Sequence, residues 1–373
     1  MSDQTLSAPV SGGFLKRTAL IGAALFVCLA VALFAGARFG LLLAVGLGFG
    51  ITLEACRFGF AGPWRAMILR REPAGILAQL VAIALVAIIA FPLLDSRPDE
   101  MIGAIAPVGW AMVGGAFVFG AAMQVVLGCG SGTLVNAGSG NPIGFLSLPF
   151  FAIGSFFGAS HLLWWTSLGS APVVAFTGTS GLVVTLLALA AVAALLLAIA
   201  APGTRRIPRR MWIAAVLIAV FALANLAIAG QPWGVVYGLG LWAAKGAVAL
   251  GADLSQNAFW GTAGNSERLG ASILTDVTSL TNLGIIAGAL LVAAWRGGLA
   301  QKLPHLPLRA WVAVIVSGFL LGYSSRLAFG CNVGAFFSGI STGSLHGWAW
   351  FAAAFAGSAA GLRLRPLLGL ERR

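Results

Sequence analysis

The feature that most limits how this chain can fold is a series of nine long apolar stretches. A helix needs about 20 residues to cross the hydrocarbon core of a bilayer, which is roughly 30 Å thick. Only 9% of the 373 residues are charged, against roughly 25% in an average soluble domain. These observations exclude a soluble globular fold. We predict an all-α polytopic membrane protein with crossing helices near residues 18–36, 75–94, 107–128, 144–166, 179–201, 211–230, 280–296, 309–329 and 346–363.

Four further apolar stretches are short or interrupted by glycine. Segments of this kind cannot cross a membrane alone, and irregular backbone at membrane depth must be buried against protein or line a water-filled cavity. We therefore predict four re-entrant or half-helix segments, at residues 41–56, 132–142, 234–250 and 333–344.

The net charge of +12 reflects basic clusters between the apolar stretches. Such clusters mark cytoplasmic loops of membrane proteins, so no nucleic-acid partner is expected. The loop at 202–210 and the tail at 366–373 are both basic, which places them in the cytoplasm. Counting nine crossings puts the N-terminus outside and the C-terminus inside. Lys16 and Arg17 then lie outside, as the one exception to the charge rule.

Two parts of the chain resemble each other. The stretch 120–132 aligns without gaps on 322–334 at an offset of 202, and a glycine-cysteine pair falls at the same place in both. The predicted topology enters the two stretches from opposite sides, as in transporters with inverted repeats. We predict a disordered tail at 1–17, membrane repeats at 18–201 and 211–365, and a basic linker between them at 202–210. Glycine-rich helix contacts without any function are the alternative.

The strongest candidate residues for chemistry are two cysteines in these repeated stretches. Cys129 and Cys331 each lie between glycines, which let the backbone turn sharply and expose N–H groups and a thiol to a small ligand. A single free cysteine is more often an inert apolar side chain, but the symmetric placement favours a functional pair. The supporting polar and backbone groups are Gly128, Gly130, Ser131, Gly132, Asn136, Gly330, Asn332, Gly334 and Ser338.

Charged residues inside apolar stretches are expensive and therefore candidates for function. Glu54 and Arg57 bracket Cys56, where they would steer an ion or form a structural ion pair. Arg326 and Lys245 would draw an anion inward from the outside, or extend to the lipid headgroups. The cysteines show no CxxC spacing and none suited to zinc or haem, so no cofactor is expected. Cys28 receives no role, and His346 is expected to form a hydrogen bond at the start of a helix.

These motifs resemble the YeeE/YedE family of sulfur-compound membrane transporters. The resemblance rests on Glu54-Ala-Cys56-Arg-Phe, on Gly128-Cys129-Gly-Ser-Gly132 and above all on Gly330-Cys331-Asn-Val-Gly-Ala335. It implies a multi-pass protein of the bacterial inner membrane, with an hourglass arrangement of two pseudo-symmetric halves. It further implies thiosulfate uptake along a path lined by three cysteines, which carry over to Cys56, Cys129 and Cys331.

The function expected from this resemblance is uptake of thiosulfate or a closely related sulfur anion, with the thiols as transient hydrogen-bond donors. A small cytoplasmic sulfur-carrier protein is the partner that the resemblance suggests. Two alternatives stay open. One is a membrane sulfurtransferase or redox protein that forms a cysteine persulfide, and the other is a channel for another small anion.

Overall fold

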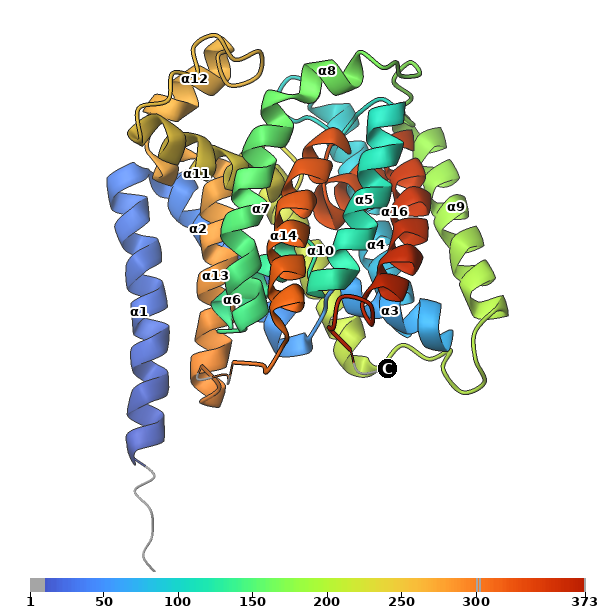
Figure 1. Ribbon diagram of the computed structural model, residues 1–373, viewed down its shortest axis with the longest axis horizontal. Coiled ribbons are helices and arrows are strands. Elements are labelled where there is room, and N and C mark those ends of the chain that lie inside the picture. Colours follow the sequence, from blue (N-terminus) through green and yellow to red (C-terminus); the bar gives the residue numbers. More distant parts are fainter. Residues whose placement is uncertain (1–10, 300, 302, 372–373) are drawn as a thin grey trace, which may run out of the picture.

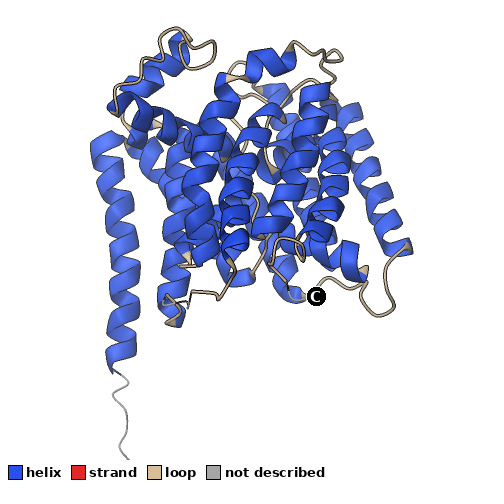
Figure 2. Ribbon diagram, in the orientation of Figure 1, coloured by secondary structure: helices blue, strands red, loops and turns tan. Residues whose placement is uncertain are grey.

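The computed structural model describes residues 11–299, 301 and 303–371, and every extended element of regular structure in this part is helical (Figures 1 and 2). The all-α prediction is confirmed. The helices are α1 (Ser11–Ala35), α2 (Ala37–Cys56), α3 (Ala61–Arg70), α4 (Ala74–Ser96), α5 (Trp110–Val126), α6 (Gly130–Gly138), α7 (Pro142–Ser160), α8 (Leu162–Thr166), α9 (Gly178–Ala198), α10 (Arg209–Ala229), α11 (Val236–Ala249), α12 (Ala263–Gly270), η1 (Ile273–Thr275), α13 (Val277–Arg296), α14 (Leu308–Leu327), η2 (Asn332–Phe337), α15 (Ser338–Ser341) and α16 (Leu345–Leu364).

Nine helical segments of the described chain are long and apolar enough to cross a membrane, which matches the expected number. One of them is the continuous stretch of α2 and α3, which the sequence did not predict as a crossing. The last predicted crossing, α16, is a 20-residue helix that lies outside this set of nine. It runs beside α5 within the bundle (Figure 1).

The prediction of a broken segment at 41–56 is wrong. These residues form the continuous 20-residue helix α2, because their glycines serve helix packing and not chain reversal. A Cβ on Gly46 would lie 2.6 Å from the carbonyl oxygen of Thr281, and a Cβ on Gly284 would lie 2.6 Å from Cα of Gly46. Small residues spaced four apart on both partners bring the two helix backbones together, and α2 therefore packs along α13.

The prediction that the two chain ends lie on opposite sides is also wrong, since it did not count α2 as a crossing. Because α2 crosses the bundle, α1 starts at the same end of the molecule as the C-terminus (Figure 1). The guanidinium carbon of Arg17 lies 5.0 Å from the ring centroid of Trp295, at the end of α13. Arg17 therefore belongs to the lower face of Figure 1, together with α3 and the linker between α9 and α10.

The other three short segments are confirmed. They form α6 with nine residues, α11 with 14 residues, and η2 followed by α15. Of the predicted tail, residues 11–17 already belong to α1, and residues 1–10 lie outside the described part of the chain.

Two helix pairs surround the Gly-Cys segments with closely similar contacts. Gly154 of α7 lies against the carbonyl oxygen of Phe319 on α14, and Gly357 of α16 lies against that of Phe117 on α5. In each pair the glycine lets the two helix backbones approach closely. These contacts hold α5 and α14 in place, and the two helices end at the two Gly-Cys turns.

Candidate functional site

The two Gly-Cys turns begin with the same backbone conformation. Leu127 ends α5 in the left-handed region with φ of 55°, and Phe329 follows α14 with φ of 55°. A residue with a side chain seldom adopts this region, so its occurrence at equivalent places points to a constraint shared by both turns. After each turn the cysteine is the N-cap of a new short helix, α6 for Cys129 and η2 for Cys331.

Cys129 is held at the start of α6 by its own helix. Its sulfur accepts a hydrogen bond from the backbone N–H of Gly132 at 3.4 Å and lies 3.5 Å from Oγ of Ser131. The Thr133 hydroxyl donates to the carbonyl oxygen of Cys129 at 2.8 Å. The side chain is 1% exposed, so the thiol sits in the protein interior at the positive end of a nine-residue helix.

Cys331 starts a turn of π-helix, a form that occurs frequently at functional sites. The residue is fully buried. Next to it, the side chain of Asn332 is also fully buried, and neither its amide nitrogen nor its amide oxygen has a hydrogen-bond partner. Buried polar groups are normally paired, so this unpaired side chain is an exception at the Cys331 turn.

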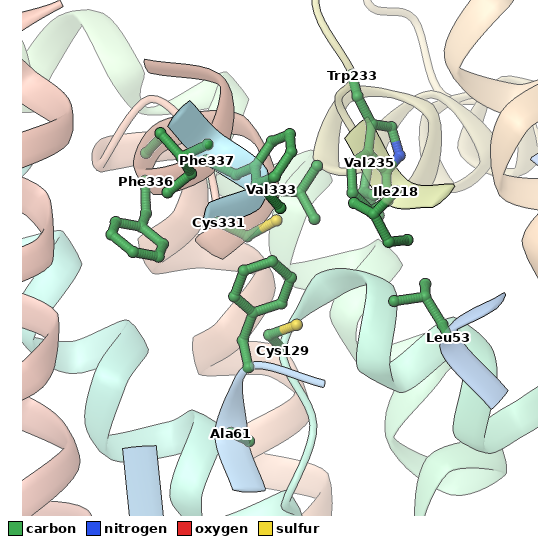
Figure 3. Packing of buried hydrophobic residues seen from close by; sticks show 14 of the residues in the cluster. Leu53, Ala61, Cys129, Ile218, Trp233, Val235, Cys331, Val333, Phe336 and Phe337 are labelled. Carbon is green, nitrogen blue, oxygen red and sulfur yellow. The ribbon is translucent and has the colours of Figure 1, made fainter. Parts of the chain in front are cut away.

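The fold brings the two cysteines together although 202 positions separate them in the sequence. Figure 3 shows their sulfur atoms one above the other, both pointing to the same side. Gly130 makes this approach possible, because a Cβ there would lie 2.8 Å from Sγ of Cys331. The sequence repeat thus corresponds to one shared site.

Aromatic rings pack around the two thiols. Phe336 and Phe337 follow Cys331 on η2 (Figure 3). The ring of Phe336 lies 6.3 Å from that of Phe60 between centroids, and the ring of Phe337 lies 5.8 Å from that of Trp233. All four side chains are at most 1% exposed, so the site is enclosed at this level of the molecule.

A cavity of about 390 Å³ opens from the lower side of Figure 1 and ends at Cys129. We call it the lower cavity. Its wall includes the predicted residues Glu54, Arg57, Gly128, Cys129, Ser131, Gly132 and Asn136. Phe58, Phe60, Ser139, Asn141 and Gln301 also line it, and no motif in the sequence pointed to them as a group.

A second cavity of about 380 Å³ reaches the Cys331 turn from the upper side of Figure 1. We call it the upper cavity. Of the predicted residues it includes Arg326, Gly330 and Gly334. Sequence analysis did not place Gln231, Tyr237, Ser325 and His346 there, since they come from separate segments without a common spacing. The two cavities therefore approach the cysteine pair from opposite sides.

Six predicted site residues line neither cavity. Gly130, Cys331 and Asn332 are buried at the cysteine pair, and Cys56, Ser338 and Lys245 have other surroundings. Cys56 is partly buried at the end of α2, in the field of Arg210 and Arg296. Ser338 donates to the carbonyl oxygen of Trp233 at 2.7 Å. Lys245 donates to the backbone carbonyl oxygens of Leu269 at 2.7 Å and Ala271 at 2.5 Å, so its charge ties the α12 region to α11.

The ionic partner of Glu54 is a residue that the sequence did not suggest. Its carboxylate lies 3.9 Å from Nη1 of Arg296, and Nη2 of that arginine donates to the carbonyl oxygen of Ala55 at 3.0 Å. Arg57 lines the same cavity. The lower cavity wall thus carries one acidic and one basic side chain. Within the described residues, no group of three or more His, Cys, Asp or Glu side chains is arranged to hold a metal ion.

Comparison with protein families gives one match. The sequence model of the family described as "Sulphur transport" matches residues 55–360 of this chain, and this range includes all three cysteines of the predicted path.

Individual relatives agree with this match. The chain is 26% identical over 334 residues to the thiosulfate transporter TsuA of Spirochaeta thermophila, covering 82% of this chain and 92% of that protein. It is 36% identical over 99 residues to a protein named probable transporter YedE of Escherichia coli, and 35% identical over 94 residues to its Salmonella typhimurium counterpart. These two alignments span about a quarter of each YedE protein, 24% and 23% of their lengths.

Proposed function

Because this chain belongs to the sulphur transport family, we propose that it carries thiosulfate, or a closely related sulfur-containing anion, across the bacterial inner membrane. One observation carries the proposal. One cavity reaches the buried Cys129, and the other reaches the turn that carries the buried Cys331 from the opposite side of the molecule. The relative named as a thiosulfate transporter, which aligns over most of both chains, supports this substrate class.

The chemistry of the narrow region suits a sulfur anion. Thiols are weak hydrogen-bond donors, and the terminal sulfur of thiosulfate is a soft acceptor, so each thiol binds it only transiently. Weak successive sites favour movement over trapping. The first turns of α6 and η2 both face this region, and the positive ends of helices attract anions. Thiolates would repel the ion, so the thiols act in their protonated form.

The orientation of the protein in the membrane is inferred from the charges on the two faces. The lower face carries the arginines of α3 and of the linker between α9 and α10, and by the positive-inside rule this face is cytoplasmic. Both the start of α1 and the C-terminus then lie in the cytoplasm, and Lys16 and Arg17 no longer contradict the rule. Uptake runs from the upper cavity, past Cys331 and Cys129, into the lower cavity.

Cys56 is the last thiol on this proposed path. It lies at the end of α2 near the lower face, within electrostatic range of Arg210 and Arg296, where it would contact an ion leaving the lower cavity. The basic lower face is also where a small sulfur-carrier protein of the cytoplasm would dock to receive the ion.

The two halves are proposed to be inverted repeats. Supporting this, the segment from α5 to α7 and the segment from α14 to α16 each hold a Gly-Cys turn followed by a short helix. The contacts of Gly154 with Phe319 and of Gly357 with Phe117 are related by offsets of 203 and 202. In Figure 1, α5 descends to its turn whereas α14 ascends to its turn.

The decisive experiment is uptake of radiolabelled thiosulfate into proteoliposomes that contain the pure protein. We expect Cys129→Ala and Cys331→Ala to abolish uptake and Cys56→Ala to reduce it strongly. Cys28→Ala is the matched control, since Cys28 lies on α1, away from both cavities. Uptake that persists in both buried-cysteine variants would refute the thiol path and favour a simple anion channel. Label that stays on the protein without accumulating inside would favour sulfur transfer.

A further inference from the structure

The upper cavity contains one charged side chain without a counter-charge. Arg326 lies in the last turn of α14, and no acidic residue lines the cavity with it. Among the described residues its guanidinium forms no ion pair, and its Nε is buried without a hydrogen-bond partner. An unpaired cation in a low-dielectric interior is expensive. An anion that enters this cavity would relieve that cost.

Two aromatic rings hold the guanidinium in a fixed orientation. Its central carbon lies 4.6 Å from the ring centroid of Phe259 and 5.6 Å from that of Tyr237. Both rings also line the upper cavity. Rings stabilise a cation through their faces and leave the in-plane N–H donors of arginine unused. Those donors match the spacing of two oxygens on one oxyanion.

His346 supplies a second unused donor to the same cavity. The residue is 1% exposed and lines the cavity, and its Nε2 has no partner. Its Nδ1 lies 2.6 Å from Oγ of Ser344, which accepts a hydrogen bond from the N–H of Ala106 at 3.4 Å. The Ser344 hydroxyl is fully buried, and Nδ1 is the acceptor within its reach, so its proton goes there. The ring proton therefore sits on Nε2, which is a donor.

We propose that Arg326 and His346 form a capture site for a tetrahedral dianion such as sulfate or thiosulfate in the upper cavity. Both groups bind oxygen atoms, so this site accepts either ion, and selection for sulfur is left to the thiols below. The cavity of about 380 Å³ is large enough for such an ion with several waters, each of which occupies about 30 Å³ in the liquid. The inference rests on the proposed function, because the site is the first stop on the same path.

A second arginine leads toward this site from the upper surface. Arg268 lies 5.2 Å from the ring centroid of Tyr237, the ring that Arg326 also contacts. Arg268 lines a neighbouring cavity of about 540 Å³ together with the acidic residues Glu267 and Asp276, and this cavity shares Gln231, Tyr237 and Thr278 with the upper cavity. Two cations thus flank one ring, on the way from the surface to the Cys331 turn.

The test is binding of sulfate to the purified, detergent-solubilised protein, measured by isothermal titration calorimetry. We expect Arg326→Gln to weaken sulfate binding about 10- to 100-fold, because a charged donor is lost from a buried site. Arg97→Gln is the matched control. It removes the same charge from an exposed position at the end of α4, where Arg97 is paired with Glu100, and should leave sulfate binding unchanged.

A second pair of variants keeps the proposal testable if Arg326→Gln does not fold. His346→Asn retains a group near Nδ1 and removes Nε2, whereas His346→Gln places an amide donor near Nε2. We expect the asparagine variant to bind sulfate about 3- to 10-fold more weakly than the glutamine variant. Equal affinities of these two variants would overturn the site, as would wild-type affinity in Arg326→Gln or no binding to the wild type at millimolar sulfate.

Thiosulfate uptake by wild-type proteoliposomes is measured in parallel to separate the two proposals. Uptake without sulfate binding would refute the capture site alone. Sulfate binding that depends on Arg326, without any uptake, would support the capture site and refute transport.

Discussion

The two Gly-Cys turns share a left-handed residue at their start but differ in the charge placed beside them. At the offset of 202, Arg326, which precedes the Cys331 turn in the sequence, corresponds to Gln124, which precedes the Cys129 turn. Gln124 is fully buried and donates to the carbonyl oxygen of Ala61 at 3.1 Å, so it holds α3 in place. Arg326 has no such role and faces a cavity.

This difference teaches how one architecture can serve two tasks. The upper half concentrates an unpaired cation where the ion would arrive. In the lower half the charges are paired, since Glu54 and Arg57 both line the cavity and Glu54 contacts Arg296. An ion held by an unpaired cation on one side and by balanced charges on the other would be captured above and released below.

The largest expected effect tests whether the two turns are equally strained. Gly330 has φ of +150°, and a Cβ there would lie 2.6 Å from the backbone nitrogen of Ala335. A Cβ on its counterpart Gly128 would meet the Thr133 hydroxyl at 3.1 Å, and the Asn136 amide nitrogen and the Thr133 backbone nitrogen at 3.3 Å. We expect Gly330→Ala to destabilise the protein by about 3 kcal/mol and Gly128→Ala by about 1 kcal/mol. Thermal unfolding in detergent measures both, and equal shifts would contradict the comparison.

The next effect tests whether Gln124 is structural. Gln124→Leu removes the hydrogen bond to Ala61 while keeping the side-chain volume. We expect a loss of about 1 kcal/mol in stability, with sulfate binding unchanged. The matched variant Arg326→Leu should instead lose sulfate binding. If Gln124→Leu weakened sulfate binding as strongly as Arg326→Leu does, the two halves would not differ in the way described.

A smaller effect tests the charge balance of the lower cavity. Glu54→Gln leaves Arg57 and Arg296 without their carboxylate, so the cavity becomes more positive. We expect the ion to be held longer, with efflux from preloaded proteoliposomes slowed about threefold, as an energy below about 1 kcal/mol would give. Unchanged efflux rates would show that Glu54 serves only to position α2 against α13.

The smallest effect concerns the ion pairs that tie the C-terminus to the lower face. Burial raises the pKa of Glu371, but hydrogen bonds from Arg365 and Arg65 outweigh this and lower it below the usual value of 4.5. A lowered pKa stabilises the fold at neutral pH, and this stability is lost as the pH falls below about 4.5. We expect Glu371→Gln to cost less than about 1 kcal/mol at pH 7, because Glu371 is partly exposed and the buried Arg365 keeps its hydrogen bonds to the carbonyl oxygens of Gln124 and Val125. Its unfolding temperature should then approach that of the wild type near pH 3.

Most of the fold could be predicted from the sequence. The main error was the broken segment predicted at 41–56, where the spacing of the glycines was not considered. In α2 the glycines at 46 and 50 recur every four residues and face Gly284 and Gly288 of α13. That pattern is typical of helix contacts, whereas the glycines around Cys129 are closer together. Lys16 and Arg17, which broke the positive-inside rule, were the signal that a crossing was missing.

The candidate site was only partly predictable from the chain. Arg326 stood out because a charge in an apolar stretch is rare, and the cysteines stood out through the repeat. His346, Tyr237 and Gln231 come from different segments and reach one cavity only through the packing of α11, α14 and α16. No spacing in a single sequence links such residues. That Cys56 lies off both cavity walls was likewise beyond the reach of a motif.

The enclosed aromatic layer at the level of the two thiols has a consequence for the energy supply of the cell. A continuous file of water through the protein would conduct protons and dissipate the gradient that an energised membrane maintains. Phe60, Phe336, Phe337 and Trp233 fill this level with apolar rings and interrupt any such file. In the proposed transport a dianion would have to displace rings to pass, and between one ion and the next the rings would keep protons from crossing.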